Sequence, residues 1–499
     1  MAYFSKKKRI ILTYLLFLLC LLPLRSENVK VRILQTTDIH SFIEHGDLPG
    51  EGGWLRLATM IKKHRAQEEC LLIDCGDTIQ GSLSALASHG AAAIDMLNHL
   101  KYDFWVPGNH ELDFGIPRLL ELLEITNVPI LSGNFKITGI KPHSFKPWKM
   151  VEKKGARICV IGMQASFLRH WFKGGDFEDY QIAKAFAVLE KEMPEILAQK
   201  PHAIILALHQ GFLFRELRGV NEISQITKRF PEIDLILGGH THQLHSGRNL
   251  SGVYYSQAAF HASHLGVIDL QIDLKKHQVI NIKSGLEKAT ADIPKDLDAD
   301  KVYDKWRRLV AKFSTEVIFK LKSPIKSRGR PGRNCAISAV IARSLQEASG
   351  ADFAVHGKFT NGDLSESVTE KALFKIIPYE NNIYVLTLTR QQLEKLMQEQ
   401  MRYFKSRSFN GPQGFQLKVN KTTHQMTELI LPEKKLLYTL AVNSRVASGG
   451  GGRFLWLKSE IEAGRIPSRE VQINTREALK GFLLKQTKEF VCPKNIIYE

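Results

Sequence analysis

Polar side chains able to bind metal ions directly follow several short, apolar, β-rich runs in this 499-residue chain. Helical patterns separate some of these runs, because Trp54, Leu57, Ala58 and Ile61 share one helix face and residues 116–123 form a second apolar helix. This alternation predicts a layered α/β domain whose site lies beyond the carboxyl ends of its strands. The predicted buried strands are residues 31–34, 71–73, 104–106, 158–161, 203–208 and 235–237.

The side chains at these strand ends are carboxylate, amide and imidazole groups. Such ligands suit two divalent cations, zinc, manganese or similar, which can together hold a phosphate and activate a water molecule. Each residue alone is more often a turn cap or a structural histidine, but chance poorly explains the ordered set. The candidate metal ligands are Asp38, His40, Asp77, Asn109, His209, His240 and His242.

The motifs that contain these residues resemble those of a known enzyme family. The order D-x-H, G-D, G-N-H-E, H-x-G and G-G-H-T-H is similar to the calcineurin-like metallophosphoesterases. The segments GDTIQGS and GNHELDFG resemble those of the 5'-nucleotidase and UDP-sugar hydrolase family. The resemblance implies an α/β (α+β) fold, with a four-layer β-sandwich flanked by helices and a second, smaller α/β domain joined by a linker helix.

The resemblance also implies a role for each site residue. One metal ion would be bound by Asp38, His40, Asp77 and His242. The other would be bound by Asp77, Asn109, His209 and His240, with Asp77 as the bridge. His110 would assist the leaving oxygen or stabilise charge on the phosphoryl group, and Asp113 would orient that imidazole. A purely orienting role for His110 is the alternative.

Changes in composition along the chain predict four segments. Residues 1–26 are typical of a signal peptide, with a basic start and an apolar run too short to span a bilayer comfortably. The phosphoesterase domain is expected at 27–295, and a linker helix and loop at 296–333. The linker helix is indicated by Val302, Trp306, Phe313 and Val317 at helical spacing. A substrate-binding domain is expected at 334–499.

The second domain departs from the pattern that the family uses to hold a nucleotide. His356 stands where asparagine is expected and Asn361 where an arginine is expected. One base-stacking ring is predicted at Phe415, with a core aromatic as the alternative, and Arg445 occupies the position of the second ring. A guanidinium group can stack on a base and pair with phosphate, so Arg445, Phe415 and Asn361 are the candidate substrate-binding residues.

The formal net charge of +18 favours an anionic substrate, but no arginine-aromatic cluster indicates a nucleic acid polymer as partner. The scattered cysteines predict buried free thiols, although Cys70 and Cys75 flank a strand and could pair. The leader predicts export to the periplasm or the extracellular space, with membrane attachment only if it stays uncleaved. The oligomeric state is not predicted.

These observations together predict a metal-dependent phosphoric ester hydrolase in which metal-activated water attacks phosphorus. A nucleotide or nucleotide-sugar is the expected small-molecule substrate. One alternative is a related phosphatase, cyclic-nucleotide phosphodiesterase or sulfur-ester hydrolase with another substrate. A second alternative is a binding protein without turnover, which the complete ligand set argues against.

Overall fold

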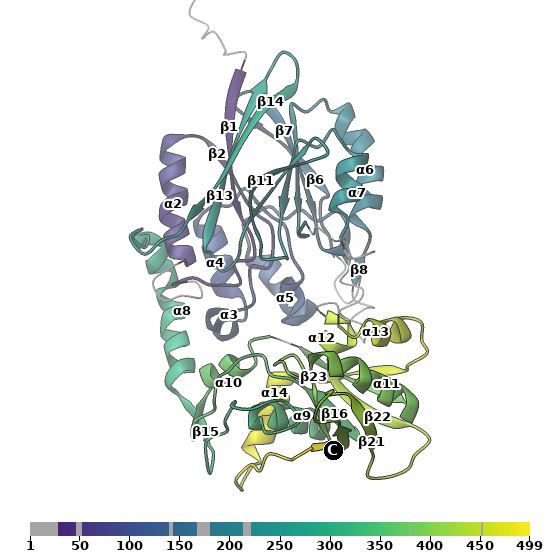
Figure 1. The fold of residues 1–499 in the computed structure, drawn as a ribbon. Coiled ribbons are helices and arrows are strands. Elements are labelled where there is room, and N and C mark those ends of the chain that lie inside the picture. Colours follow the sequence, from purple (N-terminus) through teal and green to yellow (C-terminus); the bar gives the residue numbers. More distant parts are fainter. Residues whose placement is uncertain are drawn as a thin grey trace, which may run out of the picture.

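The computed structural model describes residues 28–45, 52–138, 143–166, 180–212, 221–379, 381–450 and 453–499. Two groups of sheets are connected by one long helix along the side of the molecule (Figure 1). The predicted signal peptide, residues 1–26, lies outside the described residues. Among the described residues, no helix has the length and apolar content needed to cross a membrane.

Two sheets pack face to face in the first domain. Apolar side chains from both, among them Ile33, Ile73, Val160, Ile205 and Leu270, fill the space between them. The five-stranded sheet has the order β14 (Gln278–Lys288), β13 (His264–Asp273), β1 (Asn28–Thr36), β2 (Cys70–Asp74), β3 (Phe104–Trp105). The six-stranded sheet has the order β11 (Leu244–Leu250), β12 (Val253–Ala258), β10 (Leu235–Gly238), β9 (Ala203–Leu208), β7 (Ala156–Met163), β6 (Trp148–Lys153).

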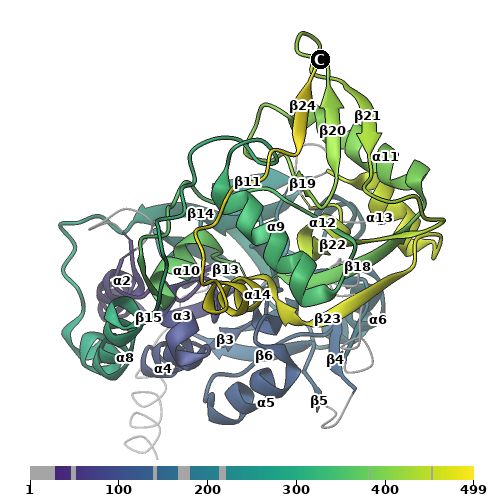
Figure 2. The ribbon, with the colours of Figure 1, turned by 90° about the horizontal axis from the view of Figure 1, so that it is seen from below.

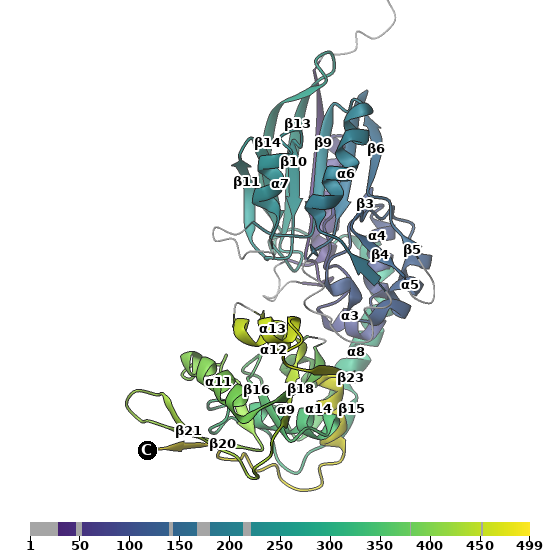
Figure 3. The same ribbon diagram turned by 90° about the vertical axis from the view of Figure 1, so that its right-hand side faces the viewer.

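Helices cover the outer face of each sheet. Helices α2 (Trp54–Gln67), α3 (Leu83–Ser88) and α4 (Ala91–His99) lie with the five-stranded sheet, and the buried Leu57 and Ile61 belong to the same core cluster as Leu72. Helices α6 (Ala185–Ala198) and α7 (Ile223–Arg229) cover the six-stranded sheet (Figure 3). The predicted four-layer α/β sandwich is therefore confirmed. A small sheet of β4 (Phe135–Ile137), β5 (His143–Ser144) and β8 (Tyr180–Ile182) lies beside α5 (Gly115–Ile125).

The linker helix is α8 (Leu297–Thr315). Asp296 caps its first turn by accepting a hydrogen bond from the backbone N–H of Ala299. The Tyr303 hydroxyl lies 2.5 Å from the Ser84 hydroxyl, which fixes the helix to the first domain. Val317 was placed on this helix by its spacing, and that placement is wrong. The helix ends at Thr315, because Val317 begins strand β15 (Val317–Lys320), which pairs with β17 (Ser367–Thr369).

The second domain is built on a five-stranded sheet. Its order is β19 (Gly411–Gln413), β16 (Phe353–His356), β22 (Tyr438–Asn443), β18 (Asn382–Leu388), β23 (Ser468–Asn474). Helices α9 (Ala336–Ser349) and α14 (Thr475–Leu484) lie side by side on one face, next to α10 (Glu370–Ile376) (Figure 2). The other face packs against α11 (Arg390–Gln400), the 3-10 helix η4 (Met401–Tyr403) and α13 (Leu455–Glu462).

The remaining elements of this domain are short. Helix α12 (Ser444–Ala447) directly follows β22. A separate sheet contains β21 (Met426–Ile430), β20 (Gln416–Val419) and β24 (Ile496–Tyr498). The five described cysteines are all free, and four of them are buried, so Cys70 and Cys75 do not pair.

Candidate active site

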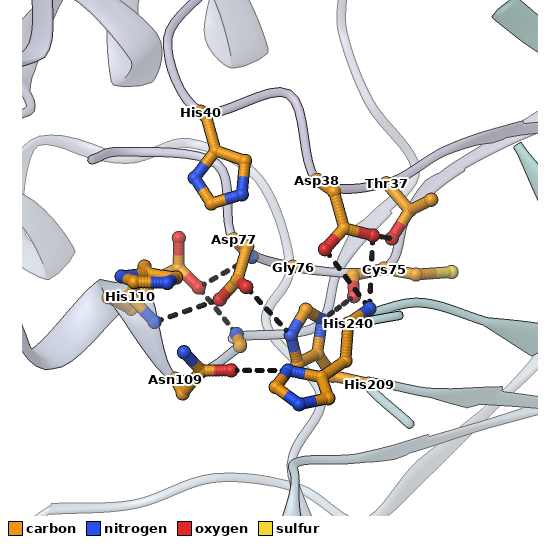
Figure 4. Close-up of polar contacts among 12 residues, drawn as sticks. Thr37, Asp38, His40, Cys75, Gly76, Asp77, Asn109, His110, His209 and His240 are labelled. Carbon is orange, nitrogen blue, oxygen red and sulfur yellow. Dashed lines mark hydrogen bonds and ion pairs between the residues drawn. The ribbon is translucent and has the colours of Figure 1, made fainter. Parts of the chain in front are cut away.

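The predicted ligands meet where the two sheets of the first domain present the carboxyl ends of their parallel strands. Asp38 and His40 follow β1, and Asp77 follows β2, whereas His209 follows β9 and His240 follows β10. Figure 4 shows these side chains pointing toward one another. Potential ligand atoms lie within 4.8 Å of one another in the groups Asp38–His40–His242, Asp77–His209–His240 and His40–Asp77–His110.

The hydrogen bonds of His40 and His209 fix which ring nitrogen of each points away from the centre. The Nδ1 atom of His40 lies 2.7 Å from the backbone oxygen of Gln80, and that of His209 lies 2.6 Å from the backbone oxygen of Cys75. Because a carbonyl only accepts, Nδ1–H is the donor in both, so Nε2 is the nitrogen of each ring that a cation could bind in place of a proton. The Nε2 atoms of His40 and His242 lie 3.1 Å apart, and Nε2 of His209 is 3.0 Å from Asp77 Oδ2.

The carboxylate and amide ligands complete this arrangement. The backbone N–H of His240 donates to both oxygens of Asp38, each at 3.0 Å, and the Thr37 hydroxyl donates at 2.6 Å. The Asn109 Oδ1 atom lies 2.9 Å from Nδ1 of His240. Carboxylate, amide and imidazole groups converging in this way are a donor set that fits two divalent cations.

Most of these ligands occupy a strained backbone conformation. Left-handed φ angles are uncommon for residues other than glycine and cost about 1–3 kcal/mol each when the surrounding structure enforces them. Such strain gathers at functional sites, so the angles mark the loops as built for binding. The ligands with positive φ are Asp38 (51°), His40 (53°), Asp77 (56°), His240 (69°) and His242 (55°).

Two glycines allow the loops that carry the candidate ligands to lie close to one another. A Cβ atom on Gly108 would lie 2.3 Å from the Asp77 carboxylate and 2.7 Å from the His209 ring. A Cβ atom on Gly239 would lie 2.5 Å from the Thr37 hydroxyl oxygen and 2.9 Å from Nδ1 of His209. Any side chain at either position would displace a ligand or its hydrogen-bonding partner.

Glu111 holds the loop that carries Asp77. Its buried carboxylate accepts hydrogen bonds from the backbone N–H of Asp77 at 2.9 Å, Thr78 at 2.6 Å and Ile79 at 3.1 Å, and also from that of Gly108. Burial and the charge of Asp77 raise the pKa of Glu111. The sequence analysis missed this role, although the motif G-N-H-E contains the residue.

His110 and Asp113 form the predicted pair. The Nδ1 atom of His110 lies 2.7 Å from Asp113 Oδ2, and the 3-10 helix η1 (His110–Leu112) sets their spacing. Burial opposes a charged imidazole, but the carboxylates of Asp113 and Asp77 outweigh it and raise the pKa of His110 to about 10. The ring therefore carries a positive charge at neutral pH.

The surroundings lower the pKa of two neighbouring candidate ligands, Asp77 and His240. Burial alone would raise the pKa of Asp77, but the charges of His209 and His110 hold it well below its usual range. Burial and the charge of His209 lower the pKa of His240 to about 4, so this ring is neutral and its lone pair is available. An ionised carboxylate beside a neutral imidazole is the state in which both groups bind a cation.

His261 lies at the edge of the site and was not predicted. Its ring stacks on Phe42 at 3.8 Å between centroids and lies 5.4 Å from the His40 ring. Its backbone N–H donates to the carbonyl of Asp38 at 2.8 Å. It stands in the segment FHASH, which carries no motif of its own, so only the fold places it near the ligands.

The three predicted substrate-binding residues do not gather at one place. Arg445 lines a cavity of about 190 Å³ in the second domain. Phe415 is only 2% exposed, and its ring meets Phe353 edge to face within the core, so the alternative of a core aromatic is the one that the structure supports. Asn361 is exposed and is not among the residues lining this cavity.

Comparison with known proteins agrees with both halves of this architecture. Residues 31–244 match the model of the calcineurin-like phosphoesterase family. Residues 310–459 match the model of the 5'-nucleotidase C-terminal domain. Residues 31–244 therefore form a calcineurin-like phosphoesterase domain, and residues 310–459 form a 5'-nucleotidase C-terminal domain. Both are domains of phosphoester hydrolases, in agreement with the enzyme class predicted from the sequence.

Individual relatives of this phosphoesterase are distant. A 2',3'-cyclic-nucleotide 2'-phosphodiesterase/3'-nucleotidase of Haemophilus influenzae is 27% identical over 285 residues, 49% of this chain and 43% of that protein. The 5'-nucleotidase of Bos taurus is 26% identical over 328 residues, 58% of this chain and 55% of that protein. The chain thus spans about half the length of the curated relatives it matches.

A solved structure resembles the whole chain. It is a putative 5'-nucleotidase of Staphylococcus aureus in complex with alpha-ketoglutarate, with a TM-score of 0.79 and 20% identity. The match covers 94% of this chain and 100% of that one. At this identity the likeness shows that the fold is shared.

Proposed function

We propose that this phosphoesterase uses two divalent cations, zinc, manganese or similar, to hydrolyse nucleotides or related small phosphate esters. The observation that supports the proposal is the convergence of seven potential ligand side chains, two of which, His40 and His209, use Nδ1 to donate to a backbone carbonyl and turn Nε2 toward the other candidates. Asp38, His40 and His242 would hold one ion. Asn109, His209 and His240 would hold the other, and Asp77 would bridge the two.

The residues of the chain have separate parts in this reaction. Bound cations would polarise a phosphoryl oxygen and activate water. His110 holds a proton at neutral pH, since its pKa is raised to about 10. Its Nδ1 atom is occupied by Asp113, so Nε2 is the atom that can donate the proton to the leaving oxygen. Asp113 holds the ring in this orientation.

The proposal is tested with a substrate panel. The purified chain, loaded with manganese or zinc, is assayed with AMP, UDP-glucose, a 2',3'-cyclic nucleotide and p-nitrophenyl phosphate. Release of phosphate or of the alcohol above a chelator-treated control supports hydrolysis. A chain that binds no metal and cleaves none of the four esters contradicts the proposal and supports the binding protein instead.

A cyclic-nucleotide phosphodiesterase is the second candidate. It is favoured by the relative from Haemophilus influenzae, a 2',3'-cyclic-nucleotide 2'-phosphodiesterase/3'-nucleotidase that is 27% identical to this chain over 285 residues. The same panel separates the candidates, because this activity opens the cyclic ester faster than it cleaves AMP. We further propose that residues 1–26 direct export to the periplasm or beyond. The domain boundaries at 295 and 333 remain proposals as well.

A further inference from the structure

The cavity in the second domain is lined by cationic side chains from four separate segments. Lys358 follows β16, Arg407 precedes β19, Arg445 lies on α12, and Arg453 precedes α13. No aspartate or glutamate is among its described lining residues. Positive charge concentrated in a concave site attracts and holds anions.

Among the described residues, these four charged side chains have no acidic partner. In the described part of the chain, no carboxylate lies within ion-pair distance of any of them. Lys358 donates to the backbone oxygen of Ser327 at 3.0 Å, and Arg453 to that of Ser408 at 3.3 Å. Burial and the nearby charge of Arg445 lower the pKa of Arg453. An anion in the cavity would relieve this repulsion.

A nearby arginine outside the cavity is, by contrast, paired with a carboxylate. Arg465 lies twelve positions beyond Arg453, and two of its guanidinium nitrogens donate to Glu460 at 2.8 and 2.9 Å. The second domain thus pairs an arginine on its surface and leaves those of the cavity unpaired. Acidic side chains are therefore present in this domain and pair with arginine elsewhere, and the cavity holds positive charge although such partners exist.

The uncharged lining residues do not form a site for a flat base. Burial lowers the pKa of His356 to about 4, and its ring is occupied by the backbone oxygen of Gly357 at 2.7 Å and the side-chain amide of Asn443 at 3.4 Å. The rings of Phe359 and Tyr379 meet each other edge to face, 5.6 Å apart at 69°. Two rings that stack on opposite faces of a base must be parallel, so Phe359 and Tyr379 do not form such a stacking site.

The cavity is structurally connected to the region of the catalytic pair. Tyr379 lines the cavity, and its neighbours Ile377 and Asn381 accept hydrogen bonds from Arg476 at 2.9 Å and Thr475 at 2.7 Å. The charge of Arg476 acts in turn on Asp113. Helices α12 and α13 lie on the side of the second domain that faces the first (Figures 1 and 3).

We propose that this cavity binds a second anionic group of the substrate, a phosphate or a carboxylate, in place of an uncharged base. The preferred substrate then carries two anionic groups, one cleaved at the metal centre and the other held by Arg445, Arg453, Lys358 and Arg407. This inference rests on the proposed function, because the metal centre supplies the cleavage.

Two matched substrate pairs test the proposal on the full-length, metal-loaded chain. Orotidine 5'-phosphate and uridine 5'-phosphate differ by a carboxylate on the base. Adenosine 3',5'-bisphosphate and AMP differ by a phosphate. We expect kcat/KM to favour the more anionic member of at least one pair by about tenfold to a hundredfold, as charge-assisted hydrogen bonds provide. The pair that shows the preference identifies the kind of anion.

Variants assign this preference to the cavity. Arg445→Gln and Arg453→Gln should bring the ratio close to one, whereas the surface variant Arg465→Gln, with the same loss of charge, should leave it unchanged. Circular dichroism verifies that each variant is folded. Ratios at or below one in both pairs would overturn the proposal, as would a preference that survives both cavity variants.

A binding experiment separates this inference from the proposed function. Chelator-treated protein is titrated calorimetrically with inorganic pyrophosphate, which requires no cleavage. Dissociation at least tenfold weaker in Arg445→Gln and Arg453→Gln than in Arg465→Gln supports the anion site even if no ester is hydrolysed. Equal affinities in all variants refute it even if hydrolysis is observed.

Discussion

Replacing Glu111 by glutamine should loosen the loop that carries Asp77. One carboxylate oxygen of Glu111 accepts from Thr78 and Ile79, and the other accepts from Asp77 and Gly108. An amide keeps one of these oxygens and turns an NH₂ group, a donor, toward the two remaining N–H groups. Two charge-assisted hydrogen bonds are lost whichever way the amide turns, about 3–6 kcal/mol at about 1.5–3 kcal/mol each.

Thermal unfolding followed by circular dichroism measures this loss. At about 2–4 °C per kcal/mol for a domain of this size, the first transition should fall by about 6–24 °C. Metal content after gel filtration should fall as well, because Asp77 is no longer held in its left-handed conformation. The control is Glu121→Gln, whose side chain is 63% exposed and pairs with Arg118 at the surface. A Glu111→Gln protein with the melting point and metal content of this control would refute the reasoning.

Three further predictions concern the reaction. His110→Ala should lower kcat by about two to four orders of magnitude and leave metal content unchanged in elemental analysis, as expected for a lost proton donor. Asp77→Asn should lower metal content by more than one ion per chain, because a single carboxylate faces both groups of ligands. Asp113 raises the pKa of His110, so the charged ring persists up to a pH of about 10. In Asp113→Asn, activity should therefore fall off at lower pH on the alkaline side of a kcat/KM profile, and an unchanged profile would contradict this assignment.

The convergence of the candidate metal ligands could be predicted because their positions follow from local rules. Each stands just after a run of buried β residues, and parallel strands bring their carboxyl ends to one edge, so residues as distant as Asp38 and His242 must meet. The helix boundary at Thr315 was missed because β-branched Val317 fits helical spacing and strand pairing equally well.

The second domain was less predictable, because its cavity has no local signature. Residues 358, 407, 445 and 453 come from four separate segments, and nothing in any one of them indicates that the charges face a common space. Phe415 shows the converse difficulty, since an aromatic residue after a glycine turn suits either a stacking platform or the core. Only packing decides, and the ring of Phe353 occupies the face of Phe415 at 5.1 Å.

The two halves of the chain therefore bear different constraints. The candidate ligand Asp77 has a left-handed backbone that the hydrogen bonds of Glu111 and the close approach of Gly108 enforce, so a change at either residue would disturb the candidate centre. The cavity in the second domain requires only that its wall stay folded, and Arg445 can replace a ring there without disturbing the core. We infer that the candidate metal centre accepts few amino-acid substitutions, whereas the lining of the cavity accepts many. The same cleavage reaction can then act on different substrates. For that reason we assign the reaction from the first domain and infer the substrate from the charges of the second.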